Sequence, residues 1–245
     1  MQSISILGVR VDVTDTAAAM ETMEGFIRSR QPHQVVTADA SGVILAQRDR
    51  ELMRIINGAD LVTPDSTGIL WAAKRFGTPL PERVSGIDLL QVLCAEAAKT
   101  GYGVFCLGSE PGVADAAAEE LKRRYPGLDI VGTHHGYFGP EESDEVVRKV
   151  HDASPDILFV AFGIPRQEKW IHRYMKEMRV PLAIGVGGSF DVISGKVKRA
   201  PVWMQKHGLE WMHRLISNPK KYRKCMTLPV FAWKVLRANQ RKPKD

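Results

Sequence analysis

The chain has 245 residues, 44% of them hydrophobic, which is enough for one large domain or for a domain with an appendage. Its net charge of +6 is unevenly divided. Residues 196–245 carry 14 Lys and Arg and two acidic residues, whereas residues 1–195 carry 20 Lys and Arg and 26 acidic residues. No run approaches the ~20 apolar residues of a membrane-spanning helix, no signal-peptide pattern opens the chain, and the scattered Cys94, Cys106 and Cys225 fit a reducing cytoplasm, with Cys94 and Cys106 in the core.

The pattern of apolar residues predicts strands and helices that alternate along the chain. Residues 4–13 indicate two short strands around Gly8, a hairpin, and Thr14 or Asp15 is placed to cap a helix that ends near Arg30. Compact apolar runs then predict six strands, at residues 34–37, 59–63, 103–107, 128–133, 157–162 and 182–186. Helices are expected between them, for example at 112–124 and 141–153.

This alternation is typical of an α/β fold, a doubly wound, Rossmann-like and mostly parallel sheet with helices on both faces. In such folds, ligands bind beyond the carboxyl ends of the strands, near the point where the strand order reverses. The strand pattern stops after residue 195. We therefore expect a Rossmann-like domain over residues 1–195 and a basic, amphipathic, helical C-terminal appendage over residues 196–245.

Two glycine-containing segments follow predicted strands. Residues 108–112 (Gly-Ser-Glu-Pro-Gly) suit either a phosphate at a helix N-terminus or a tight turn between strand and helix. Residues 185–191 (Gly-Val-Gly-Gly-Ser-Phe-Asp) would let the backbone approach a ligand closely, and Asp191 would accept hydrogen bonds from a ribose or a base. A crowded turn is the alternative, but we favour the ligand.

Three polar residues near strand ends each have two interpretations. Asp65 is either the N-cap of a helix or a general base. Arg83 either clamps a phosphate or pairs with Asp88. Gln167 follows Pro165, which starts a helix, and either contacts a sugar or faces solvent.

The sequence contains few metal or nucleotide signatures. His134 and His135 are adjacent, so on a strand they would point to opposite faces, and no cluster of other ligands lies near them. There is no Asp-x-Asp, no Walker loop, no spaced dinucleotide fingerprint and no Gly-x-Ser-x-Gly elbow. We expect chemistry without a metal or a cofactor, and an oxidoreductase or a serine hydrolase is disfavoured.

The basic C-terminal part mixes cations with apolar residues at helical spacing. One stripe consists of Leu228, Phe231, Val235 and Leu236, flanked by Lys and Arg. Such a pattern favours contact with an anionic membrane surface, because phosphate binding alone needs no apolar stripe. The alternatives are nucleic-acid binding, a solvated tail, or packing of the stripe on the body.

Seven motifs in order resemble those of the WecG/TagA/CpsF family of bacterial glycosyltransferases, from about Ile6 to Arg223. They occupy residues 35–40 (VVTADA), 59–68 (ADLVTPDSTG), 83–89 (RVSGIDL), 136–138 (GYF), 162–170 (FGIPRQEKW), 185–191 (GVGGSFD) and 199–201 (RAP). The residues at 208–215 and 219–224 also look like the C-terminal appendage of the family.

The resemblance implies an inverting hexosyltransferase of cell-surface polysaccharide or teichoic acid synthesis. The donor would be a UDP-sugar, typically of N-acetylmannosamine or its uronic acid, and the acceptor a sugar on undecaprenyl diphosphate at the cytoplasmic face of the membrane. Asp65 would be the base, with Thr37, Arg83 and Gln167 in the same pocket. The motifs add substrate-binding positions at Asp39, Gly108, Tyr137, Gly163, Pro165, Gly187, Gly188 and Asp191.

The appendage would bring basic residues to the diphosphate, at positions matching Arg214, Lys221 and Lys224; relatives commonly have Arg at the last two. A second departure is Asp39, where the family usually has Asn. We expect no nucleic-acid partner, and the oligomeric state stays open. The competing class is a basic-tailed α/β protein that binds nucleic acid or a nucleotide without transferring a sugar.

Overall fold

A computed structural model describes residues 1–201, 203, 204, 212 and 226–238. Its centre is a six-stranded sheet in the order β4-β3-β8-β7-β5-β6, and every pairing in it is parallel. The strands are β3 (His33–Ala38), β4 (Leu61–Pro64), β5 (Val104–Gly108), β6 (Ile130–His134), β7 (Ile157–Ala161) and β8 (Leu182–Gly185). The α/β fold and all six predicted strands are thereby confirmed, with ends shifted by a few residues.

A separate antiparallel hairpin, β1 (Ser3–Ile6) and β2 (Val9–Asp12), precedes the sheet and confirms the turn predicted at Gly8. Asp15 caps the helix that follows, since its carboxylate accepts a hydrogen bond from the Ala18 amide at 2.8 Å. The helices are α1 (Thr16–Ser29), α2 (Ala40–Ala46), α3 (Arg50–Gly58), α4 (Thr67–Arg75), α5 (Gly86–Thr100), α6 (Val113–Arg124), α7 (Ser143–Ala153), α8 (Arg166–Met178), α9 (Ser189–Ile193) and α13 (Thr227–Arg237), with a 3₁₀ turn η1 (Pro140–Glu142).

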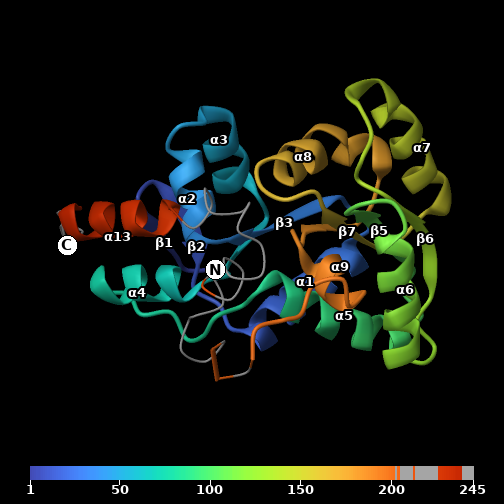
Figure 1. Ribbon diagram of the computed structural model, residues 1–245, viewed down its shortest axis with the longest axis horizontal. Helices are drawn as coiled ribbons and strands as arrows, with labels where there is room; N and C mark the ends of the chain where they lie inside the picture. The colour runs from blue at the N-terminus through green and yellow to red at the C-terminus, as the bar shows by residue number, and fades with distance from the viewer. Residues whose placement is uncertain (202, 205–211, 213–225, 239–245) are drawn as a thin grey trace.

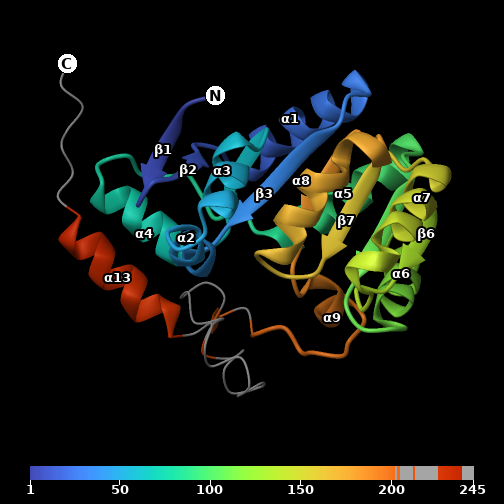
Figure 2. The ribbon, with the colours of Figure 1, turned by 90° about the horizontal axis from the view of Figure 1, so that it is seen from above.

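Helices cover both faces of the sheet, as expected for strands that are apolar throughout (Figures 1 and 2). Apolar residues of α1, α5, α6 and α9 form the core on one face, and those of α7 and α8 form the core on the other. Cys94 and Cys106 are buried, as predicted, and desolvation raises the pKa of the Cys106 thiol to about 12. A third core joins the hairpin to α2, α3, α4 and α13.

The helix α13 packs against α2 and α4, at the end of the molecule opposite β6 (Figures 1 and 2). Phe231 and Val235 are 2% and 0% exposed in the core shared with these helices. The expectation that the whole stripe of Leu228, Phe231, Val235 and Leu236 meets lipid is therefore wrong, because half of it is buried against the body. Leu236 remains 57% exposed.

Among the described residues, no helix has both the length and the apolar character to cross a membrane. The proposed domain boundary at residue 195 stays a prediction. However, the burial of Phe231 and Val235 shows that a segment beyond it completes a core of the body.

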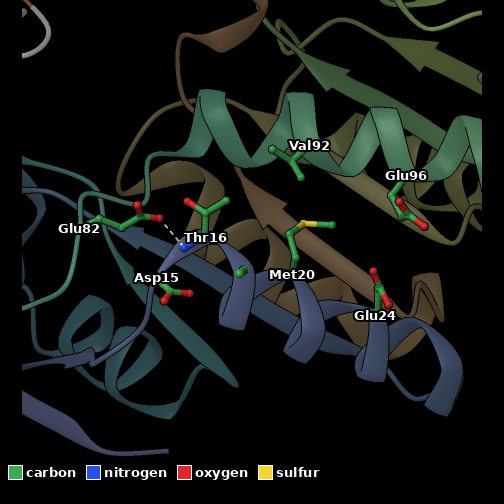
Figure 3. A pocket seen from close by; sticks show the side chains of 8 residues that line it. Asp15, Thr16, Met20, Glu24, Glu82, Val92 and Glu96 are labelled. Carbon is green, nitrogen blue, oxygen red and sulfur yellow. Dashed lines mark hydrogen bonds between the residues drawn. The ribbon is translucent and has the colours of Figure 1, made fainter.

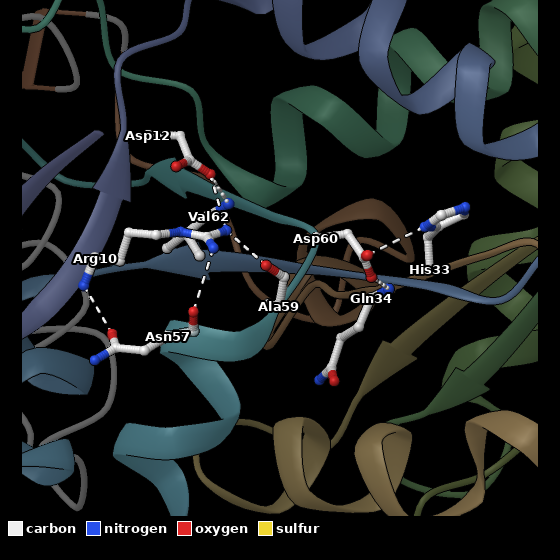
Figure 4. Close-up of polar contacts among 8 residues, drawn as sticks. All are labelled: Arg10, Asp12, His33, Gln34, Asn57, Ala59, Asp60 and Val62. Carbon is white, nitrogen blue, oxygen red and sulfur yellow. Dashed lines mark hydrogen bonds and ion pairs between the residues drawn. The ribbon is translucent and has the colours of Figure 1, made fainter. Parts of the chain in front are cut away.

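The hairpin is fixed to the sheet by a buried polar group, Asp12, which is 4% exposed. Its carboxylate accepts a hydrogen bond from the Val62 amide at 2.8 Å and from the Arg10 guanidinium at 3.2 Å (Figure 4). Arg10 also donates to the Ala59 carbonyl oxygen at 2.6 Å, and its amide donates to Asn57 Oδ1 at 2.8 Å. These bonds join β2 to the start of β4.

Replacing Asp12 by Ala should lower the free energy of unfolding by about 1–3 kcal/mol, because the buried Val62 amide loses its acceptor. Urea denaturation measures this change. Asp12→Asn keeps an acceptor oxygen and should cost less, and Asp152→Ala, at an exposed position on α7, should change little. An Asp12→Ala protein as stable as the wild type would contradict the role of this bond in holding the hairpin.

Candidate active site

The loops that follow the strands are linked to one another at the carboxyl edge of the sheet. The Asp65 amide donates to the Ala38 carbonyl oxygen at 2.9 Å, which joins the ends of β4 and β3. The Val84 amide donates to the Pro64 carbonyl oxygen at 2.9 Å, which brings the segment before α5 to the same place. Asp65, Asp39 and Arg83 are thus neighbours along three adjacent backbone segments.

Asp65 is not the N-cap of α4. Ser66 takes that position, and its hydroxyl accepts a hydrogen bond from the Ile69 amide at 3.3 Å. The capping interpretation of Asp65 is therefore wrong, and its carboxylate is half-buried. A carboxylate at a strand end, beside a ligand site, is suited to accept a proton.

Asp39, by contrast, caps a helix: its carboxylate accepts a hydrogen bond from the Gly42 amide at 2.6 Å, at the start of α2. Asn and Asp are about equally good N-caps. A carboxylate at this position thus preserves the local backbone where the family usually has Asn.

Thr37 lies at the end of β3, and its hydroxyl donates to the Gly185 carbonyl oxygen at 3.2 Å. A Cβ added to Gly86 would lie 3.4 Å from the Thr37 side chain and 3.6 Å from that same oxygen. The N-terminus of α5 therefore sits directly on the ends of β3 and β8. This contact places Thr37 among the candidate residues.

Arg83 pairs with Asp88, as one of its two interpretations predicted, with 3.6 Å between Nη2 and Oδ2. The Asp88 carboxylate also accepts hydrogen bonds from the Ser85 hydroxyl at 2.5 Å and from Arg199 Nη2 at 2.7 Å. One carboxylate in the first turn of α5 thus holds two guanidinium groups. Arg83 is oriented by this pairing.

Gln167 is 4% exposed, so the prediction that it would face solvent is wrong. Its Oε1 accepts hydrogen bonds from the Gly163 amide at 3.0 Å and from the Gly187 amide at 3.1 Å. A Cβ added to Gly185 would lie only 2.4 Å from its Nε2. Gln167 therefore ties the loop after β7 to the loop after β8.

Glycine is required for different reasons in the two glycine-containing segments, residues 108–112 and 185–191. Gly108 has φ +138°, and a Cβ there would lie 2.6 Å from the Ala161 carbonyl oxygen of the neighbouring strand, so the tight-turn interpretation explains it. Gly187 has φ +54° with nothing within 4 Å of an added Cβ. Its left-handed backbone explains Gly187, and contact with Gln167 explains Gly185, so ligand binding by this loop stays a prediction. Gly188 adjoins it, and Asp191 follows in the first turn of α9.

Side chains join the loops after β5 and β6 to the segment after α9. Lys196 donates to the Glu110 carboxylate at 2.5 Å, and this bond lowers the pKa of Glu110 and raises that of Lys196. Tyr137, which is 64% exposed, also hydrogen-bonds Glu110 and lowers its pKa. The charge of Asp191 further raises the pKa of Lys196. Three predicted segments thereby meet at one cluster.

Arg166 holds the loop that carries Tyr137, a role that sequence reasoning missed although its motif was recognised. Its guanidinium donates to the Gly136 and Phe138 carbonyl oxygens at 2.7 and 3.0 Å and lies 4.6 Å from the centre of the Phe162 ring. The preceding peptide bond of Pro165 is cis, and Pro165 precedes the first residue of α8, as predicted.

The histidine pair is arranged differently from the prediction. The rings of His134 and His135 lie 4.6 Å apart, not on opposite faces, because β6 ends at His134. The described residues contain no group of three His, Cys, Asp or Glu that could hold a metal ion. Arg214, Lys221 and Lys224 lie outside the described residues.

A cavity of about 570 Å³ opens between α1 and α5, away from these loops. Its lining includes four carboxylates, those of Asp15, Glu24, Glu82 and Glu96 (Figure 3). Two of them have structural partners, since Asp15 caps α1 and Glu82 accepts from the Thr16 amide at 2.5 Å. Because its charge repels a diphosphate, this cavity is not a candidate for a nucleotide.

The parallel sheet and the joined strand-end loops are those of a Rossmann-like α/β enzyme. The model of the glycosyl transferase WecG/TagA/CpsF family matches residues 4–245, nearly the whole chain. The chain belongs to this family of glycosyltransferases. The resemblance noted in the motifs is thus confirmed, and a binding protein without transferase activity is no longer a competing class.

Three relatives share the same name, N-acetylglucosaminyldiphosphoundecaprenol N-acetyl-beta-D-mannosaminyltransferase. The chain is 36% identical to that of Bacillus spizizenii over 203 residues, 83% of this chain and 78% of the relative. It is 33% identical to that of Bacillus subtilis over 208 residues, 85% and 80% of the two chains. It is 32% identical to that of Staphylococcus aureus over 240 residues, which are 97% of this chain and 94% of the relative.

Replacing Gln167 by Met should loosen the loops after β7 and β8, because the Gly163 and Gly187 amides lose their shared acceptor. We expect a loss of about 1–3 kcal/mol in the free energy of unfolding and faster hydrogen exchange at those two amides. Denaturant titration and exchange mass spectrometry measure the two effects. Lys176→Met, at an exposed position on the same helix, should produce neither. Unchanged exchange at Gly187 would show that Gln167 does not position this loop.

Proposed function

We propose that the chain transfers an N-acetylmannosaminyl group, or that of a related hexose or uronic acid, from a UDP-sugar to N-acetylglucosaminyl-diphospho-undecaprenol. The observation that carries the proposal is the match to the Staphylococcus aureus transferase along 97% of this chain and 94% of the relative. The strand-end site supports it, because the loops that hold nucleotides in α/β folds are present and joined.

The donor diphosphate would bind near the loops after β5 and β8. The helix α6 begins there without a side-chain N-cap, so its first amides and its dipole favour an anion. Lys196 adds a cation at the same edge, held by Glu110. Gln167 would keep the Gly187 amide in place for this contact.

Asp65 would be the general base. The acceptor hydroxyl oxygen attacks the anomeric carbon of the donor, the bond from that carbon to the diphosphate oxygen breaks, and UDP leaves with the electron pair. The hydroxyl proton passes to the Asp65 carboxylate, and attack opposite the leaving group inverts the anomeric configuration. Ser66, and not Asp65, caps α4, and this supports the role of Asp65 as the base.

Asp65→Asn should reduce the transfer rate by about 10²–10⁴-fold, since the amide has the same shape but cannot take up the proton. Transfer from UDP-N-acetylmannosamine to a lipid-diphosphate acceptor is the measurement, and UDP affinity should change little. Asp152→Asn removes the same charge from an exposed site on α7 and should transfer at the wild-type rate. More than about a tenth of wild-type turnover in Asp65→Asn would exclude this residue as the base.

We also propose that no divalent metal takes part, and that Arg, Lys and backbone amides stabilise the departing diphosphate instead. Transfer should then proceed undiminished in EDTA and should not rise on addition of Mg²⁺ or Mn²⁺. Activity that is lost in EDTA and restored by either ion would overturn the metal-independent mechanism.

The protein would work as a peripheral protein on the inner face of the cell membrane, where a lipid-linked acceptor lies. On α13 the exposed large hydrophobic residues are Val230, Trp233 and Leu236, and Arg237 lies 4.1 Å from the centre of the Trp233 ring. Trp beside Arg suits the headgroup region of an anionic bilayer. We infer that this outer face of α13, and not the whole stripe expected from the sequence, contacts the membrane.

Leu236→Gln and Trp233→Gln together should weaken binding to anionic liposomes about tenfold, or ~1.4 kcal/mol. Co-sedimentation at low salt measures it. Val92→Gln, on α5 and 38% exposed, is the control and should bind like the wild type. These variants spare the core formed by Phe231 and Val235, which truncation at residue 195 would remove. Equal binding by the double variant would refute the membrane role of this face.

A further inference from the structure

A second cavity, of about 430 Å³, lies between α5, α9 and the segment that follows α9. Three of its lining residues are cations: Arg124 from the end of α6, and Lys198 and Arg199 from the segment after α9. Of the described residues that line it, none is acidic. The strand-end mechanism above uses none of these three cations.

The three cations differ in the ion pairs that they form. Arg124 shares Glu120 with Arg123, at 2.7 Å in each case. Arg199 shares Asp88 with Arg83. Lys198 is exposed and forms no ion pair within the described part of the chain. Because the described lining contains no acid and Lys198 has no ion pair there, an anion in the cavity would be attracted to this edge.

The remaining walls are largely apolar, with Ile87 on α5, Val192 on α9 and Val197 beyond it. A cavity with cations on one side and aliphatic groups on the other fits a ligand that has a phosphate and an uncharged organic part. A bare inorganic anion would leave the aliphatic side without a contact.

The acidic cavity of Figure 3 gives an internal comparison. Both cavities border α5, yet one has carboxylates in its lining and the other has Arg and Lys. The two linings therefore differ in the sign of their charged side chains. The basic cavity also adjoins the candidate active site, because Asp88 contacts both Arg199 in its wall and Arg83.

We propose that this basic cavity binds the phosphate group of an organic phosphate ester between Arg124, Lys198 and Arg199, with the ester's organic part against Ile87, Val192 and Val197. The site is separate from the strand-end loops and does not depend on the transferase proposal. Its ligand is either a free phosphate ester or the headgroup of a lipid, which share this chemistry.

Two probes with the same headgroup test the site: glycerol 3-phosphate, and dihexanoylphosphatidic acid below its micelle concentration. NMR titration of the full chain should show saturable shifts at the backbone amides of Ile87, Val192 and Val197. Tighter binding of the lipid form would assign a lipid headgroup, and equal binding would assign a free ester. Shifts confined to residues 108–112 and 185–189 would overturn the proposal, because the phosphate would then occupy only the strand-end loops.

The matched variants have the same change in charge. Arg124→Gln with Lys198→Gln should raise the dissociation constant about tenfold, equivalent to ~1.4 kcal/mol. Arg148→Gln with Lys149→Gln removes two charges from exposed positions on α7, outside the cavity lining, and it should stay within about twofold of the wild type, or ~0.4 kcal/mol. An unchanged thermal unfolding temperature shows that both variants are folded. Equal affinity in the two double variants would overturn the site.

Discussion

The position of β8 at the centre of the sheet is the constraint on which the candidate site depends. This strand is the last of the sheet in the sequence, yet it pairs with β3 on one side and with β7 on the other. It therefore joins the half of the sheet made by β3 and β4 to the half made by β5, β6 and β7. Thr37 lies on β3, and Gln167 lies on α8, which follows β7. Because β8 lies between β3 and β7, Thr37 reaches the Gly185 carbonyl oxygen and Gln167 reaches the Gly187 amide.

Shared hydrogen-bond acceptors then fix the loops around β8. The Gln167 amide oxygen serves two backbone amides, and the Asp88 carboxylate serves Arg83, Arg199 and Ser85. A shared acceptor couples the groups that it holds, since losing one partner changes the geometry of the others. The site is therefore preorganised by residues that need not touch a substrate, and Asp88 connects it with the basic cavity.

The C-terminal helix α13 has one face in the core of the body and another on the surface. The helix α13 buries Phe231 and Val235 against α2 and α4, and its Thr227 hydroxyl lies 2.8 Å from that of Ser41, two residues beyond Asp39. The same helix exposes Trp233 and Leu236 on its outer side. A membrane bound at this outer face would lie next to a helix that packs directly on α2, so the proposed lipid contact would be made close to the strand-end site.

The sequence by itself determined the six strands, the hairpin and the family, because apolar runs and ordered motifs are local patterns that can be recognised without a structure. It also located the residues at the strand ends, since alternation of strands and helices implies a parallel sheet with its ligand edge there. It could not decide between two roles for Asp65 or Gln167. The structure excludes one interpretation of each: Ser66 caps α4 in place of Asp65, and Gln167 is enclosed by two loops that lie far from each other in the chain. Helical periodicity gave α13 an apolar stripe, but only packing against α2 and α4 decided that Phe231 and Val235 face the protein and Leu236 does not, because periodicity identifies a face without saying what covers it.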